Sequence, residues 1–154
     1  MTLIPRSALI LGLLGLLPFF AGAVVSLGML EMDMGNPDDG GYPLIVAADG
    51  PRLLLDYGKI ILAFMSGVLW GFATKATGQK ATFGYILSVI PALWVFFFTG
   101  GPTSAAIINL IVGFLGLLVL DWCFWREKLA PSWWMHLRLI LTSGVIICLL
   151  TAVI

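Results

Sequence analysis

The sequence predicts an all-α membrane protein, a five-transmembrane-helix bundle, and three observations carry this prediction. Five apolar runs fill most of the 154 residues, and a helix needs about 20 apolar residues to cross a hydrocarbon core of roughly 30 Å. Hydrophobic residues make up 60% of the chain and charged residues 10%, whereas a soluble domain carries about a quarter charged residues. The runs do not alternate with period two, which favours helices over a barrel. They cover residues 8–30, 53–74, 82–99, 104–124 and 135–154.

The first run resembles a cleavable signal sequence, because Arg6 precedes an apolar stretch that ends in the small residues 21–23. The apolar character continues to Leu30, so we expect a retained helix. Proline lacks the N–H that an inner helical position donates. We therefore expect Pro18 to kink this first helix and Pro91 to kink the third, where Ser88 would satisfy the freed carbonyl of Leu87.

The five runs are predicted to form a single transmembrane domain, residues 1–154, in which one connection is long. This acidic loop, residues 31–52, is rich in turn formers around Gly35 to Gly41. Its carboxylates do not follow the spacing of a calcium-binding EF-hand loop, so a solvated external loop is the preferred interpretation.

The distribution of lysine and arginine predicts the orientation in the membrane. With five crossings, Arg6, Lys75, Lys80, Arg126 and Lys128 share one side, and the acidic loop lies on the other. The positive-inside rule then places the N-terminus in the cytoplasm and the C-terminus outside. The expected location is the bacterial inner membrane, or the mitochondrial inner membrane in a eukaryote.

Charged residues inside a bilayer are functional candidates, because each costs several kcal/mol if it is unpaired. Asp121 closes the fourth run and Arg138 opens the fifth, and the loop between them is short. We expect the two to form a structural ion pair that holds these helices together. Binding of a substrate by the same residues is the alternative.

Small residues that repeat on one helix face allow close helix contact in lipid. The first run carries such a seam at alternating steps of four and three residues, from Ala8 to Ser26. We expect this seam to stay open for a protein partner. The glycines predicted to form helix-packing or partner faces are Gly12, Gly15, Gly22, Gly67, Gly71, Gly113 and Gly116.

Tryptophans gather near the predicted cytoplasmic interface, where indole rings act as anchors. A pocket of such rings for a tetrapyrrole is the alternative. His136 is the single histidine, so a bis-His haem has no second ligand. We therefore predict no cofactor, no metal site and no catalytic residue. The predicted interfacial anchors are Trp122, Trp125, Trp133 and Trp134.

Several segments together resemble the transmembrane protein 69 family and its bacterial relatives, domain of unknown function 3429. The family often has tyrosine where this chain has Trp134. The resemblance implies a five-helix inner-membrane protein of bacteria or mitochondria, without an assigned reaction. The segments that carry it are residues 4–6, 11–19, 57–67, 70–71, 88–91, 121, 131–138 and 141–142.

Two functions are expected from these observations. The first is a non-catalytic accessory or assembly subunit of a respiratory or photosynthetic complex, whose partners are the lipid bilayer and other integral membrane proteins, without nucleic acid. The second is a binder or carrier of a small hydrophobic molecule or tetrapyrrole, as in the translocator proteins, with lipid or pigment contacts. That family carries Pro-Pro-x-Trp and Pro-x-Trp signatures early in its sequence, and no similar motif occupies the first loop of this chain.

Overall fold

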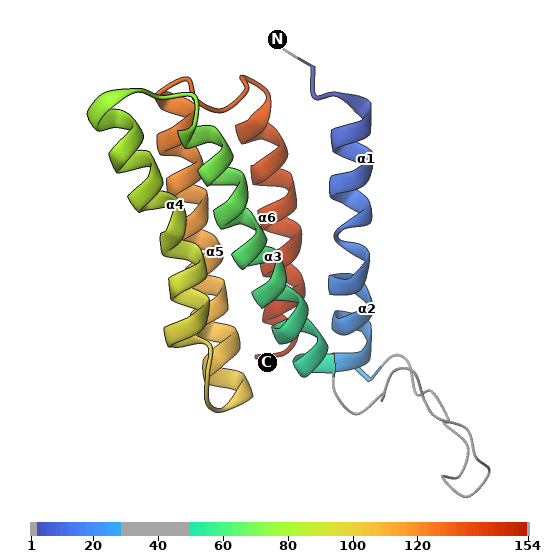
Figure 1. The fold of residues 1–154 in the computed structure, drawn as a ribbon. Coiled ribbons are helices and arrows are strands. Elements are labelled where there is room, and N and C mark those ends of the chain that lie inside the picture. Colours follow the sequence, from blue (N-terminus) through green and yellow to red (C-terminus); the bar gives the residue numbers. More distant parts are fainter. Residues whose placement is uncertain (1–2, 29–49, 154) are drawn as a thin grey trace, which may run out of the picture.

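The computed structural model describes residues 3–28 and 50–153, and every regular element within these ranges is a helix (Figure 1). The first two helices continue one another as a single apolar span of 21 residues. This span and the next three helices are long and apolar enough to cross a membrane, and the last helix is apolar but shorter, at 17 residues. The protein is therefore a multi-pass membrane protein. The helices are α1 (Arg6–Leu14), α2 (Leu17–Ser26), α3 (Gly50–Ala73), α4 (Gly78–Phe98), α5 (Thr103–Arg126) and α6 (Trp134–Leu150).

The first predicted helix is broken between α1 and α2. Pro18 lies in the opening turn of α2, where its missing N–H leaves a helix bond unmade. The chain tightens instead, as the Leu16 N–H donates to the carbonyl of Leu13 at 3.0 Å. The Tyr57 hydroxyl of α3 donates to the carbonyl of Gly15 at 3.1 Å, which fixes the break against the bundle. Residues 29 and 30 of the predicted helix lie outside the described residues.

The second proline, Pro91, lies inside α4, which stays helical on both sides of it. The Ala92 N–H donates across to the Ser66 hydroxyl of α3 at 2.8 Å. The Ser88 hydroxyl donates to the carbonyl of Tyr85 at 2.7 Å, so the prediction that it serves Leu87 is wrong. The Ser66 hydroxyl thus pairs with the N–H of the residue after the proline, and this hydrogen bond ties α3 to α4.

The third helix is the centre of the bundle. It packs against α2, α4, α5 and α6, and Figure 1 shows it running beside α2 at one end and α4 at the other. Leu54, Leu62 and Leu69 repeat at steps of eight and seven residues and are fully buried. Between α2 and α5, the rings of Phe19 and Phe114 meet edge to face at 6.3 Å.

The helices run up and down, so successive connections lie at opposite ends of the bundle. The start of α1, the α3–α4 turn and the α5–α6 loop lie at one end of Figure 1, and the α4–α5 turn and the C-terminus lie at the other. Because α3 begins at Gly50, residues 50–52 are helical and do not belong to the predicted loop. The other residues of that loop, 31–49, lie outside the described part of the chain.

Large apolar side chains cover the outer surface of α4. A water-soluble protein rarely exposes so large an apolar surface, whereas hydrocarbon accepts it. This surface therefore fits contact with lipid. Its exposed residues are Phe83, Ile86, Val89, Ile90, Leu93, Phe96, Phe97 and Phe98.

Candidate functional site

The end of α5 and the start of α6 meet in a buried ion pair. The Arg138 Nε donates to Asp121 Oδ2 at 2.6 Å, and the two side chains are 6% and 0% exposed. The Trp134 indole N–H donates to the other carboxylate oxygen, Oδ1, at 2.8 Å. Both oxygens of Asp121 therefore have donors, which is the condition under which a buried carboxylate stays charged at acceptable cost.

The loop between the two helices folds so that the pair can form. Lys128 takes a positive φ of 60°, and the backbone N–H groups of Leu129 and Ala130 both donate to the carbonyl of Phe124. The chain thus reverses directly after α5. This reversal brings Trp134 and Arg138 of α6 against Asp121, which stands 17 residues before Arg138.

Two polar atoms next to the ion pair are buried and have no hydrogen-bond partner among the described residues. They are Nη2 of Arg138 and Oγ1 of Thr142. Arg138 is 5% exposed and Thr142 is 2% exposed. The residues are four positions apart in α6, so their side chains lie on the same face of that helix.

Arg138 and Thr142 line a cavity of about 190 Å³ whose other walls come from α1, α2, α3 and α5. Those walls are apolar, with Gly12 and Gly15 where α1 meets α2. Leu11 and Phe64 also line the cavity, and they are 68% and 65% exposed. The cavity therefore reaches the lipid-facing surface between α1 and α3, with its polar residues on the α6 side.

The glycine seam of the first span faces the interior of the bundle. A Cβ on Gly22 would lie 2.7 Å from Leu54, and one on Gly12 would lie 3.0 Å from Leu141. The prediction that this seam stays open for a partner is therefore wrong at both positions, because α3 and α6 of the same chain cover them. Gly15 lies at the break between α1 and α2 and faces the backbone of its own turn.

The other predicted glycines divide into one buried position and three open ones. A Cβ on Gly113 would lie 2.6 Å from Leu62 and 2.8 Å from Trp94. Among the described residues, nothing lies within 4 Å of a Cβ built on Gly67, Gly71 or Gly116. The open faces are thus on α3 and α5.

The predicted tryptophan anchors occupy the end of the bundle that holds the α5–α6 loop. Trp122 and Trp125 are exposed, and the Trp125 indole N–H donates to the carbonyl of Ser132 at 3.1 Å. Trp133 packs edge to face on Trp134, with the ring centroids 5.9 Å apart. Trp134 differs from the other three tryptophans, because its indole N–H donates a hydrogen bond to Asp121.

The same end carries an exposed ion pair between the start of α4 and the residue after α5. The Lys80 Nζ lies 2.9 Å from a carboxylate oxygen of Glu127. The hydrogen bond from Lys80, together with its positive charge, lowers the pKa of Glu127 below its usual value. Lys75 donates to the carbonyl of Leu129 at 3.1 Å, so both lysines hold the α3–α4 turn to the α5–α6 loop.

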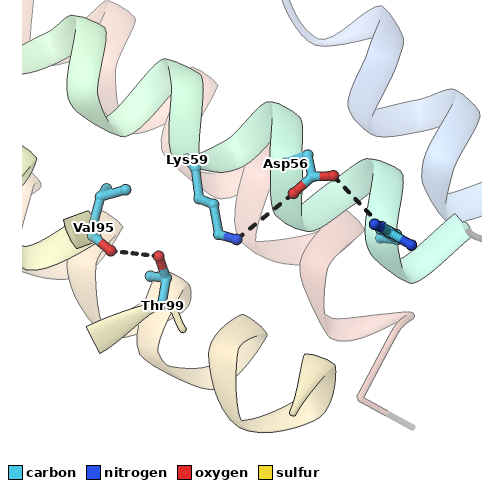
Figure 2. Close-up of polar contacts among 5 residues, drawn as sticks. Asp56, Lys59, Val95 and Thr99 are labelled. Carbon is cyan, nitrogen blue, oxygen red and sulfur yellow. Dashed lines mark hydrogen bonds and ion pairs between the residues drawn. The ribbon is translucent and has the colours of Figure 1, made fainter. Parts of the chain in front are cut away.

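A second set of charges lies at the opposite end, at the start of α3. Figure 2 shows Asp56 next to Lys59, 3.6 Å apart, and Arg52 lies 3.9 Å from the same carboxylate. Nearby in Figure 2, the Thr99 hydroxyl donates to the carbonyl of Val95 at 2.6 Å and closes α4. Asp56 is 60% exposed, so these contacts are solvated and contribute little to stability.

Within the described ranges 3–28 and 50–153, no three His, Cys, Asp or Glu side chains come together to hold a metal ion. His136 is exposed, and Cys148 is buried in α6. The buried polar cluster of Asp121, Trp134, Arg138 and Thr142 is therefore the main candidate site. The sequence indicated its ion pair but not Trp134 as a partner or Thr142 as a cavity residue.

Comparison with known proteins supplies the family. Residues 4–154 match the family described as "Protein of unknown function (DUF3429)". The chain belongs to the DUF3429 family. The resemblance indicated by the order of its segments is thus confirmed, and the bundle described above is the fold of a DUF3429 member.

A relative of this DUF3429 protein is "Transmembrane protein 69" of Xenopus tropicalis, which is 31% identical over 155 residues. The match covers 97% of the chain and 54% of the relative, so the chain spans about half the length of that protein. No solved structure matches the chain.

Proposed function

We propose that this DUF3429 protein is a non-catalytic accessory or assembly subunit of a larger inner-membrane complex, respiratory or photosynthetic. The observation that supports the proposal is an open glycine face on α3. In lipid, close packing and not apolar burial drives helices together, and small residues allow the closest approach. A glycine pair left uncovered on the central helix therefore suits a helix from another protein.

This α3 face consists of Ile60, Phe64, Gly67 and Gly71, which follow one another at steps of four, three and four residues. All four are exposed. Gly67 and Gly71 carry no side chain on this face, and the apolar side chains of Phe64 and Ile60 continue the same face toward the start of α3. A partner helix could approach the glycines closely and pack against Phe64 and Ile60.

Replacing Gly67 and Gly71 with leucine should release the protein from its complex while the monomer stays folded. A Cβ built on either glycine has no described atom within 4 Å, so each new side chain starts in open space on the outer face of α3. Native gel electrophoresis of gently solubilised membranes would measure the change. The expected result is loss of the large species and gain of the monomer.

Gly116→Leu is the matched control, because it adds the same side chain at an open glycine on a different helix, α5. It should leave the large species intact. A complex that survives Gly67→Leu/Gly71→Leu would refute the α3 interface. If Gly116→Leu alone released the protein from its complex, the interface would lie on α5 and not on α3.

We also propose that the N-terminus and the α3–α4 and α5–α6 connections face the cytoplasm, and that the C-terminus faces outside. Support comes from the basic residues at that end of the bundle, namely Arg6, Lys75, Lys80, Arg126 and Lys128. Their excess over the opposite end is typical of cytoplasmic loops.

Cysteine labelling of intact cells should test this orientation. In a protein whose own cysteines are replaced, Gly100→Cys in the α4–α5 turn should react with an impermeant maleimide added outside. Gln79→Cys at the start of α4 should react only after the membrane is opened. Both positions are exposed, so their access depends on the side of the membrane. The reverse pattern would overturn the proposed orientation.

A further inference from the structure

We propose that the cavity beside the buried ion pair binds a neutral amphipathic molecule. Its head would carry a carbonyl group that accepts hydrogen bonds from Arg138 and Thr142, and its apolar tail would leave between α1 and α3 into the lipid. This inference does not depend on the proposed role in a complex, because its two donors, Arg138 and Thr142, lie outside the α3 face and only Phe64 belongs to both sites.

The polar side of the cavity carries two unused hydrogen-bonding groups. Nη2 of Arg138 and Oγ1 of Thr142 have no partner among the described residues, although both atoms are buried. A buried polar atom without a partner loses its hydration and gains nothing in return. A carbonyl oxygen that accepts from both groups would remove this cost, and one turn of α6 separates the two donors.

The charge of the site favours a neutral head over an anion. Oδ2 of Asp121 lies 2.6 Å from Nε of Arg138, so the carboxylate already balances the positive charge of the guanidinium. A second anion would face a pair of zero net charge, with the Asp121 carboxylate close by in a medium of low dielectric constant. A carbonyl accepts the free N–H groups without adding charge.

The size of the cavity limits the head to about one ring. An apolar cavity of about 150 Å³ in another protein holds benzene, and this cavity measures about 190 Å³. A tetrapyrrole needs a far larger pocket, since pockets for drug-sized ligands begin at about 300 Å³. Since Leu11 and Phe64 line the cavity and are mostly exposed, a tail can extend from it into lipid. A quinone with an alkyl tail and the ester end of a diacylglycerol share this chemistry.

The test uses the full-length protein in phosphatidylcholine nanodiscs and a radiolabelled decyl-benzoquinone. Binding is corrected for uptake by empty nanodiscs. Thr142→Val keeps the shape of the side chain and removes the hydroxyl, so the affinity should fall about five-fold, the effect of one lost hydrogen bond. Ser143→Ala removes the neighbouring hydroxyl, which is exposed and does not line the cavity, and should not change the affinity.

A second pair of variants tests the entrance. Leu11→Trp should narrow the opening and reduce binding, whereas Leu14→Trp, on the same helix but away from the cavity, should not. Both positions are exposed, so neither change disturbs the core. Thermal unfolding of each variant would verify that the fold is intact.

Two competing ligands, dioctanoylglycerol and laurate, distinguish the possible head groups. Saturable quinone binding that dioctanoylglycerol does not displace identifies a quinone site, and saturable quinone binding that dioctanoylglycerol also displaces identifies a site for either carbonyl head; both outcomes support the proposal. Tighter binding of laurate, an anion, would overturn it. Absence of saturable binding to either neutral ligand would also overturn it, as expected if water alone satisfies the two groups. If the quinone bound Thr142→Val as tightly as Ser143→Ala, the Thr142 hydroxyl would not donate to the head group, and the proposed contact with both donors would be wrong.

Discussion

Arg138→Met should destabilise the protein by about 3–5 kcal/mol, the usual cost of breaking a buried ion pair by removing one partner. The reason is the charge left behind. Asp121 is 0% exposed, and after the substitution only the Trp134 N–H would still donate to it. The free energy of unfolding in mixed detergent micelles, followed by circular dichroism, would measure the loss.

A double-mutant cycle separates the pair from the packing of its side chains. Asp121→Asn and Arg138→Met in one protein should cost clearly less than the sum of the two single changes, because the uncompensated charge is gone. A coupling of at least about 0.5–1 kcal/mol is expected for residues in contact. Simple additivity would contradict the pair. Asp56→Asn with Lys59→Met is the control at an exposed pair within one helix, where a coupling of about 0.2–0.5 kcal/mol is expected.

Gly113→Leu should prevent the bundle from closing. The new Cβ would lie 2.6 Å from Leu62 and 2.8 Å from Trp94, and neither can withdraw easily. Leu62 is fully buried, and the Trp94 indole N–H donates to the carbonyl of Asn109 at 2.8 Å. Overpacking of a core costs about 1–3 kcal/mol even for a few added methylenes. A large drop in melting temperature, or failure to accumulate in the membrane, is the expected outcome.

Gly116→Leu provides the comparison within the same helix. It adds the same side chain three residues further on, at a position with nothing described within 4 Å. Any effect of leucine on helix propensity is therefore shared by the two variants. Equal melting temperatures for both proteins would show that Gly113 is not a close helix contact.

The helical fold could be predicted from the apolar runs, because the length of a membrane helix depends on the thickness of the bilayer. The residues at which each helix begins and ends could not be predicted. Hydropathy does not separate a helix from the turn that follows it, so α6 ends at Leu150 and not at residue 154. The break after α1 was expected at Pro18 as a kink, but its position at Gly15 and Leu16 depends on the turn that forms before the proline.

The candidate site could be predicted only in part. Opposite charges on either side of a short loop indicated that Asp121 and Arg138 could meet. The role of Trp134 was hidden, because an indole at the interface and an indole bound to a carboxylate look the same in a sequence. Which glycines face inward was equally hidden. Gly22 and Gly67 both belong to small-residue stripes, and the rotation of each helix in the bundle decides which stripe is covered.

The order of the helices along the chain has a consequence for biosynthesis. Chains are made from the N-terminus onward, so α5 with Asp121 leaves the ribosome before α6. Until the ribosome reaches α6, the carboxylate has neither of its two donors, because Trp134 and Arg138 both belong to that helix. A chain that stops within the α5–α6 loop would keep an acidic residue unsatisfied at the membrane boundary. Arrival of α6 thus completes both the charge balance of Asp121 and the wall of the cavity.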